Sequence, residues 1–208
     1  MITKLILDIS ANTTKNDDNY AKRMIDKIKK LDTGKFEIIF KAQLFETAGD
    51  NIPMEWCHFD YIYKHCHHSG YECTASVFDE KALWFLLNYD TPFIKVACND
   101  KYYSLIGHIP RNKDVYVSVP WFSKDVGYGD NITKLLCVSK YPASVKDYES
   151  IALNFKHNPY LSDHTPDLEL YKLLQPEIIE MHYALPNSTG LDADSGVCKT
   201  HHILKEIL

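Results

Sequence analysis

The stretch ECTASVFDEKALWFLLNYDTPFIKVA, residues 72–97, contains a strand, a helix and a second strand in close succession. The runs ECTAS (72–76) and FIKVA (93–97) have the length of short buried strands. Between them, residues 79–88 repeat apolar side chains at helical spacing, which gives a helix with one apolar face. Two strands joined through a helix lie parallel in one sheet, and this stretch therefore predicts an α/β protein.

The same alternation continues on both sides of that stretch. Six more runs have strand character, and they lie at residues 2–9, 36–43, 114–118, 132–139, 160–164 and 177–182. Helical spacing recurs at residues 17–31, 59–69, 147–157, 166–174 and 199–208. Eight strands that alternate with helices predict a (β/α)8 TIM barrel, near the minimal size for that fold. A doubly wound open sheet is the alternative, but it usually has fewer strands and a glycine-rich first turn, which this sequence lacks.

One outer helix of the predicted barrel is expected to be reduced. Residues 119–131, between the fifth and sixth predicted strands, have weak helical character and are expected to form a loop. A trimmed helix at this place would leave an apolar strip with Trp121 and Phe122, which suits a protein partner. With 208 residues the chain is long enough for one barrel and short for two domains, so we predict a single TIM-barrel domain over residues 1–208.

The composition argues against several classes of protein. The formal charge of −5 is not that of a generally basic nucleic-acid binder, so any anionic ligand must be held by a few locally placed cations. No apolar run approaches the ~20 residues of a membrane span, and the amino-terminal sequence is not that of a signal peptide. The six cysteines are irregularly spaced and are expected to be reduced thiols. We expect a cytoplasmic protein with no membrane or nucleic-acid partner.

Polar side chains lie at the carboxyl end of every predicted strand. The active site of a TIM barrel lies at this end, so these residues are the candidates for a site. They are Asp8, Lys41, Gln43, Ser76, Lys95, Ser118, Ser139, Tyr141, Ser162, His164, Glu180 and His182. Lys41 and Lys95 each follow aliphatic or aromatic residues, and a lysine buried in a barrel mouth requires an anionic partner. Two lysines among hydroxyl groups predict a cradle for a phosphate and a carboxylate.

Two histidines end neighbouring predicted strands. His164 and His182 are 18 residues apart in the sequence, but adjacent parallel strands are only about 5 Å apart. Two imidazoles so placed predict a divalent metal site with open positions for water or substrate, although a structural role for each is the alternative. Residues 57–73 hold a second group of cysteines and histidines, whose spacing matches no standard zinc motif. His65 and His68 of that group are three residues apart on a predicted outer helix, and we expect them to be exposed to solvent rather than to bind a metal ion.

Three segments of the sequence resemble one known family. CVSKYPAS (137–144), LSDHTPDLEL (161–170) and IIEMHYAL (178–185) are similar to characteristic blocks of the N-acetylneuraminate (sialic acid) synthase family. Weaker similarity occurs, in the same order and spacing, at residues 7–12, 40–45, 76–86 and 93–100. The family condenses phosphoenolpyruvate with an N-acetylated amino sugar. The resemblance therefore implies a TIM-barrel transferase of carbohydrate biosynthesis, which joins phosphoenolpyruvate to a sugar such as N-acetylmannosamine and releases a sialic (nonulosonic) acid and phosphate.

The resemblance also assigns roles to individual residues. The residues that would contact phosphoenolpyruvate are Lys41, Ser76, Lys95, Ser118, Ser139 and Ser162. Those that would act on the sugar or line its site are Asp8, Asp100, Tyr141 and Asp192, with Asp8 or Asp100 transferring protons. His164 and His182 would hold a divalent metal ion, Mn²⁺ or Mg²⁺. Gln43 is expected to bind substrate from its place at a strand end.

The sequence departs from the family pattern at several of these positions. Asp8 and Asp100 stand where the family usually has glutamate, so both carboxylates are one methylene shorter. Cys98 stands for a serine, Ser76 for a threonine and Ser139 for an asparagine. The loop after the eighth strand also differs. The half of the site that would bind phosphoenolpyruvate is thus largely kept, and the half that would bind the sugar is altered.

These departures leave other functions open. One alternative is a synthase that acts on a different aldose. Another is a diverged, non-catalytic barrel that binds an anionic metabolite or a protein partner. The sequence ends with the predicted barrel, so we expect no counterpart of the family's carboxyl-terminal antifreeze-like domain, through which family members dimerise. A homodimer is a further open prediction.

Overall fold

The computed structural model describes residues 4–46, 49–121, 124–127, 129–152 and 160–208. Its eight strands are all parallel and form a closed barrel in chain order. They are β1 (Lys4–Asp8), β2 (Glu37–Leu44), β3 (Glu72–Val77), β4 (Ile94–Val96), β5 (Val115–Val119), β6 (Ile132–Cys137), β7 (Leu161–Asp163) and β8 (Ile178–His182). The barrel closes where β1 pairs with β8, with Asp8 opposite His182. The predicted (β/α)8 fold is confirmed.

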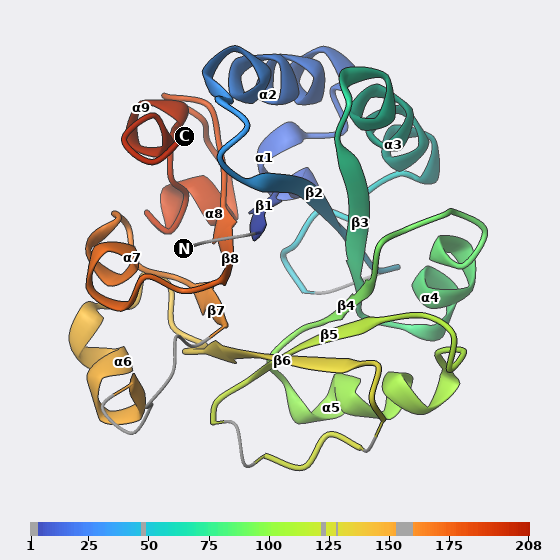
Figure 1. The fold of residues 1–208 in the computed structure, drawn as a ribbon. Coiled ribbons are helices and arrows are strands. Elements are labelled where there is room, and N and C mark those ends of the chain that lie inside the picture. The colour runs from blue at the N-terminus through green and yellow to red at the C-terminus, as the bar shows by residue number, and fades with distance from the viewer. Residues whose placement is uncertain (1–3, 47–48, 122–123, 128, 153–159) are drawn as a thin grey trace.

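Helices lie outside the strands, as Figure 1 shows for the longer ones. They are α2 (Asp18–Leu31), α3 (Trp56–Ser69), α4 (Glu80–Leu86), α6 (Val145–Ala152), α7 (Glu169–Leu174) and α9 (His201–Leu204). Among the described residues between β5 and β6 there is no helix, so the predicted reduction at this place is confirmed. Residues 2–3 of the first predicted strand, 153–157 of the predicted helix 147–157, and Phe122 lie outside the described residues. Every described helix is too short or too polar to cross a lipid bilayer.

Several helix boundaries differ from the prediction, and contacts in three helices account for the difference there. α3 begins at Trp56 rather than at 59, because the Trp56 ring packs against Phe85 of α4 with a centroid distance of 4.3 Å. α7 begins at Glu169 rather than at 166, because the Asp167 side chain accepts a hydrogen bond from the Glu169 amide at 2.9 Å and ends a turn there. α9 is shorter than 199–208, because the Lys199 amide bonds to the carbonyl of His182 at 2.8 Å and keeps the chain extended beside β8.

Four single-turn helices were not predicted from the sequence. They are α1 (Ala11–Thr14), α5 (Asp100–Tyr103), the 3₁₀ helix η1 (Ser104–His108) and α8 (Leu191–Asp194). A segment of four or five residues is too short for a repeating apolar pattern. α1, α5 and α8 each follow the carboxyl end of a barrel strand, where they position side chains at one face of the barrel.

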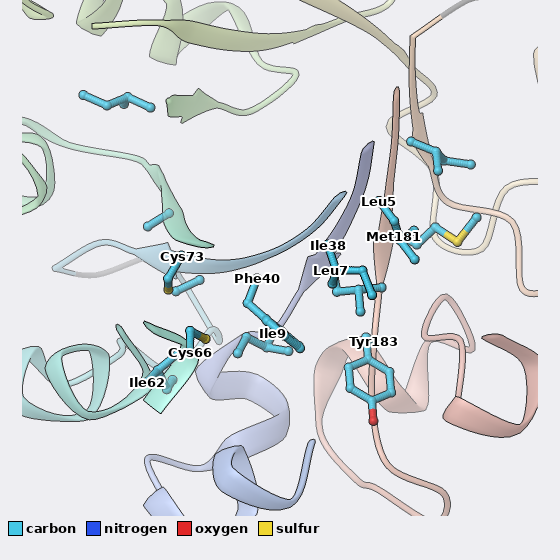
Figure 2. Close-up of a cluster of buried hydrophobic side chains, with 14 of the residues drawn as sticks. Leu5, Leu7, Ile9, Ile38, Phe40, Ile62, Cys66, Cys73, Met181 and Tyr183 are labelled. Carbon is cyan, nitrogen blue, oxygen red and sulfur yellow. The ribbon is translucent and has the colours of Figure 1, made fainter. Parts of the chain in front are cut away.

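The core has two parts, separated by the barrel wall. The larger part lies between the strands and the surrounding helices, and Figure 2 shows a section of it around Leu7, Phe40 and Ile62. The smaller part fills the amino-terminal end of the barrel interior with Ile6, Ile39, Phe93, Tyr116, Leu135 and Ile178. Side chains two positions apart on a strand share a face. The residues two positions further on therefore also face inward, and all of them are polar: Asp8, Lys41, Lys95, Ser118, Cys137 and Glu180.

Candidate functional site

A pocket of about 440 Å³ opens at the carboxyl ends of the barrel strands. It lies above the smaller part of the core, which fills the amino-terminal end of the barrel. Its lining includes every residue predicted for the site from the sequence except Asp100. These lining residues are Asp8, Lys41, Gln43, Ser76, Lys95, Ser118, Ser139, Tyr141, Ser162, His164, Glu180, His182 and Asp192. Their convergence follows from the closed parallel barrel, which brings all eight strand ends to one rim.

Lys41 and Lys95 lie at the floor of the pocket and are almost completely buried. Lys41 bonds to the carboxylate of Asp8 and, at 2.8 Å, to the hydroxyl of Ser76. Lys95 donates to the hydroxyl of Ser118 at 2.8 Å and to the carbonyl of Val96 at 3.1 Å. These hydrogen bonds fix the positions of both ammonium groups in the lining of the pocket.

Glu180 lies between the two lysines, and the sequence had assigned it no role. One of its carboxylate oxygens lies 3.7 Å from Nζ of Lys41, and the other lies 3.7 Å from Nζ of Lys95. The Ser162 hydroxyl donates to Glu180 at 2.9 Å. Glu180 was among the strand-end candidates, and it faces the pocket like His182 because residues two apart on one strand face the same side.

The pKa values of these groups follow from burial and from their neighbours. Burial lowers the pKa of Lys41, but Asp8 and Glu180 outweigh it and bring the net pKa above its ordinary value. Burial also lowers the pKa of Lys95, and here Glu180 offsets the effect only in part, so the pKa stays below its ordinary value. Burial raises the pKa of Glu180, but the two lysines more than reverse this and lower it to about 2. The pocket floor therefore carries a carboxylate that is ionised at neutral pH.

The two histidines lie side by side at the rim, with ring centroids 5.3 Å apart. Nδ1 of His164 is 2.6 Å from the carbonyl oxygen of Val138, so it donates its proton there. The hydroxyl of Tyr141 donates to Nε2 of His164 at 3.2 Å, and the two rings stack at a centroid distance of 4.2 Å. Burial, together with the neighbouring His182, lowers the pKa of His164 to about 3. His164 is therefore a neutral imidazole at physiological pH.

The donor atoms fit a divalent cation in part. With Nδ1 of His164 bonded to a backbone carbonyl, its lone pair lies on Nε2, which is the arrangement of most metal-binding histidines. A metal ion at Nε2 would take the place of the Tyr141 hydroxyl, which bonds to this atom. Within the described part of the chain, no group of three or more His, Cys, Asp or Glu side chains is placed to bind a metal ion. The protein would therefore supply His164 and His182 as ligands and leave the other positions to substrate and water.

The second group of cysteines and histidines, on and near α3, likewise forms no metal site among the described residues. His58 bonds to Asp18 at 2.6 Å and to Thr14 at 3.0 Å, and His65 bonds to Asp26 at 3.0 Å. Cys66 is buried in the core, whereas Cys57 is exposed. These side chains have separate partners and point to separate places, so they do not form one site.

Asp192 lies at the rim of the pocket, on α8. The hydroxyl of Ser10 bonds to one of its oxygens, which is also 3.9 Å from Nδ1 of His182. The side-chain amide of Asn12 donates to the other oxygen at 3.2 Å. On the same side, Gln43 donates to both oxygens of Asp8 at 3.1 Å.

Asp100 lies apart from the pocket. It starts α5, its side chain is 73% exposed, and it pairs with Lys124 at 2.9 Å. Asn99 caps this helix by accepting the amide of Lys101 at 3.1 Å, and the resulting turn directs Asp100 to the surface. Sequence position alone could not show this, because α5 was not predicted.

Trp121, the described part of the predicted apolar strip, is 51% exposed.

Two cysteines line the pocket between the lysines and the histidines. The neighbouring thiol of Cys137 stabilises the thiolate of Cys98 and lowers the pKa of Cys98 to about 6. The neighbouring Cys98 and burial raise the pKa of Cys137. The lining also includes residues that the sequence did not indicate: Asn51, Phe78, Ala97, Tyr102, Leu191 and Ser195.

The chain is similar to one known family and to several solved structures. The model of the NeuB family matches residues 14–207. A search of curated proteins finds no match to this sequence. Among solved structures, sialic acid synthetase from Leptospira borgpetersenii, in complex with citrate, superposes with a TM-score of 0.71 at 18% identity, over 99% of this chain and 81% of that one.

Two further structures have the same fold. Spore coat polysaccharide biosynthesis protein E from Chromobacterium violaceum superposes with a TM-score of 0.74 at 15% identity, over 98% of this chain and 72% of that one. A truncated 3-deoxy-D-arabino-heptulosonate 7-phosphate synthase from Thermotoga maritima superposes with a TM-score of 0.65 at 10% identity, over 99% of this chain and 83% of that one. At these identities the likeness shows a common barrel.

Proposed function

The chain belongs to the NeuB family, and from this premise we propose that it joins phosphoenolpyruvate to an N-acetylated amino sugar such as N-acetylmannosamine. The products are a sialic (nonulosonic) acid and phosphate. At the level of the family, the chain is a sugar-condensing synthase that uses phosphoenolpyruvate. The identity of the acceptor and the help of a metal ion are proposals.

The observation that carries the proposal is the pair of buried lysines at the pocket floor. Lys41 and Lys95 are surrounded by the hydroxyls of Ser76, Ser118 and Ser162, all of which line the pocket. A phosphate and a carboxylate are ligands that such a set of donors can hold without water. Phosphoenolpyruvate carries both groups on three carbon atoms.

The reaction needs one new carbon–carbon bond and one water. Carbon 3 of phosphoenolpyruvate attacks the carbonyl carbon of the acceptor, whose oxygen takes the electron pair and a proton. Water adds to carbon 2 and gives up a proton, and the carbon 2–oxygen bond to phosphate breaks as the ketone forms. Lys41, Lys95 and the serines hold the phosphate and the carboxylate in place, so that the reacting carbons meet in one geometry.

Of the two carboxylates expected to transfer protons, Asp8 lies in the pocket and Asp100 does not. We therefore assign the proton transfer to Asp8, which Lys41 and Gln43 hold by hydrogen bonds. A divalent ion, Mn²⁺ or Mg²⁺, held by His164 and His182 would act as a Lewis acid toward the acceptor carbonyl. The acceptor would lie against the rim residues Gln43, Asn51, Leu191, Asp192 and Ser195, which we call the acceptor side of the pocket.

Calorimetric titration of phosphoenolpyruvate, with and without Mn²⁺, tests the anion site. Saturable binding is expected in the wild-type protein, at least tenfold weaker in Lys95→Ala and unchanged in Lys101→Ala, whose exposed lysine lies outside the pocket. Release of phosphate with N-acetylmannosamine then tests the condensation. No phosphoenolpyruvate binding in the wild-type protein under either condition would refute the proposal.

A non-catalytic barrel that binds an anionic metabolite is the second candidate. The observation that favours it is the surface position of Asp100, since the resemblance had placed this residue at the sugar. Tight binding of phosphoenolpyruvate without phosphate release, across a panel of aldoses, would support this second candidate over the first.

A further inference from the structure

Asn12 lies in α1, directly behind the acceptor side of the pocket, and its side chain is only 1% exposed. Its Oδ1 accepts the backbone amide of Ile52 at 2.8 Å. Its Nδ2 donates to Oδ1 of Asn51 at 2.8 Å and to Oδ1 of Asp192 at 3.2 Å. One carboxamide thus joins the loop after β2 to the helix after β8.

The orientation of this carboxamide follows from its neighbours. A backbone amide can only donate, so the oxygen of Asn12 must face Ile52. The NH₂ group then faces Asn51 and Asp192, and both of its protons are used. A carboxylate in this place could accept from Ile52, but it would have no proton to offer to Asp192.

The backbone of Asn12 is fixed from the other side. Lys15 donates to the Asn12 carbonyl oxygen at 2.6 Å. Gly190, which has a φ of +113°, packs so closely that an added Cβ would lie 2.0 Å from that same oxygen. The segment that precedes α8 therefore rests on Asn12, and Asp192 two residues later depends on it for its place.

We propose that Asn12 is a positioning residue for the acceptor: it holds Asn51 and Asp192, two residues of the acceptor side, in one arrangement. This inference rests on the proposed function. It places Asn12 outside the contacts with phosphoenolpyruvate, because neither Lys41 nor Lys95 bonds to it. Loss of the Asn12 side chain should therefore raise the KM for the acceptor sugar and leave the binding of phosphoenolpyruvate unchanged.

Asn12→Asp is the sharpest test, since it keeps the shape and replaces the donor with a second carboxylate beside Asp192. The matched control is Asn16→Asp. Asn16, just past the carboxyl end of α1, bonds to the same loop, at 3.1 Å to both the Glu55 amide and the Pro53 carbonyl, but it does not line the pocket. Asn12→Ala, which only deletes the three hydrogen bonds, is measured beside them.

Phosphate release is measured against the concentration of N-acetylmannosamine, and phosphoenolpyruvate binding is measured by calorimetry. The KM for N-acetylmannosamine should rise at least tenfold in Asn12→Asp and in Asn12→Ala, because each loses a buried hydrogen bond to a charged group. The dissociation constant of phosphoenolpyruvate should stay within twofold in all variants, and Asn16→Asp should match the wild-type protein in both quantities.

The outcomes separate the two claims. Equal KM values in folded Asn12→Asp, Asn12→Ala and Asn16→Asp would overturn the role of Asn12 and leave the proposed function standing. A parallel loss of phosphoenolpyruvate affinity in the Asn12 variants would also overturn it, since the residue would then support the whole pocket. A wild-type protein that binds no phosphoenolpyruvate, or that releases no phosphate with N-acetylmannosamine, would refute the proposed function and this inference with it.

Discussion

Glu180 acts as a counter-ion for the two lysines inside the pocket, and its replacement by glutamine tests this interpretation. Its two oxygens lie 3.7 Å from Nζ of Lys41 and 3.7 Å from Nζ of Lys95. Lys41 keeps a second carboxylate, Asp8, in the variant. Lys95 does not, because Glu180 is the one carboxylate paired with it among the described residues. Glu180→Gln therefore removes a negative charge and little volume.

The expected loss in the free energy of unfolding follows from these two distances. Each ion pair contributes about 4 kcal/mol at an effective dielectric constant of 20. The penalty for burying the carboxylate, several kcal/mol, offsets part of this sum. Loss of one partner from a buried pair usually costs about 3–5 kcal/mol, and we expect that range here. In a chain of 208 residues this corresponds to a fall in Tm of roughly 6–20 °C.

Anion affinity should change in the opposite direction. Without the Glu180 charge, the two lysines have a larger unbalanced positive charge, so the dissociation constant of phosphoenolpyruvate should fall by roughly tenfold, or about 1.4 kcal/mol. Saturating phosphoenolpyruvate should then restore part of the lost Tm, because a ligand that binds only the folded state stabilises it.

Thermal unfolding at pH 7 and calorimetric titration measure both effects. Glu169→Gln, which removes one exposed carboxylate on α7, is the matched control and should change neither quantity. A Glu180→Gln variant that melts within two degrees of the wild-type protein would refute the energetic reasoning. One that binds phosphoenolpyruvate more weakly would show that Glu180 contacts the ligand rather than neutralising the lysines.

Two further predictions concern titrating groups of the pocket. The pKa of His164 falls from 6.5 to about 3 on burial, so only the unfolded state takes up its proton between these values. The free energy of unfolding should therefore fall with pH below 6.5, by about 1 kcal/mol from pH 6 to pH 5, and this part should be absent in His164→Gln when both are followed by urea denaturation without added metal. Cys98, with a pKa of about 6, should be the first cysteine that iodoacetamide alkylates at pH 7. Peptide mass spectrometry should find it protected by phosphoenolpyruvate, and equal labelling of Cys198 would contradict the prediction.

Much of the fold and part of the site were predictable from local pattern. The strand–helix alternation around residues 72–97 predicted the barrel, because the period of apolar residues depends only on backbone geometry. The lysines were candidates for the same reason, since each follows an apolar residue by two positions on an inward face. Glu180 has this same position after Ile178 and was a candidate as a strand-end residue, but the sequence assigned it no role.

The predictions from the sequence failed in segments that have no repeating pattern of apolar residues. Asp8 lies within the predicted strand 2–9, whereas Asp100 lies three residues beyond the predicted strand 93–97, and a single turn of helix capped by Asn99 carries Asp100 to the surface. Nothing in a four-residue segment distinguishes a side chain that faces the pocket from one that faces solvent. The roles given to these residues by resemblance were therefore tied to positions that loops could move.

The sequence alone determined that eight parallel strands bring lysines, hydroxyls and two histidines to one end of a barrel. Strand periodicity and the topology of alternating strands and helices suffice for this. Only the tertiary structure decided how these groups pair: that Glu180 lies between Lys41 and Lys95, and that Asn12 holds Asp192 from 180 positions away in the chain. Such pairings depend on distances across the closed barrel and between its loops, and no local pattern of residues encodes those distances.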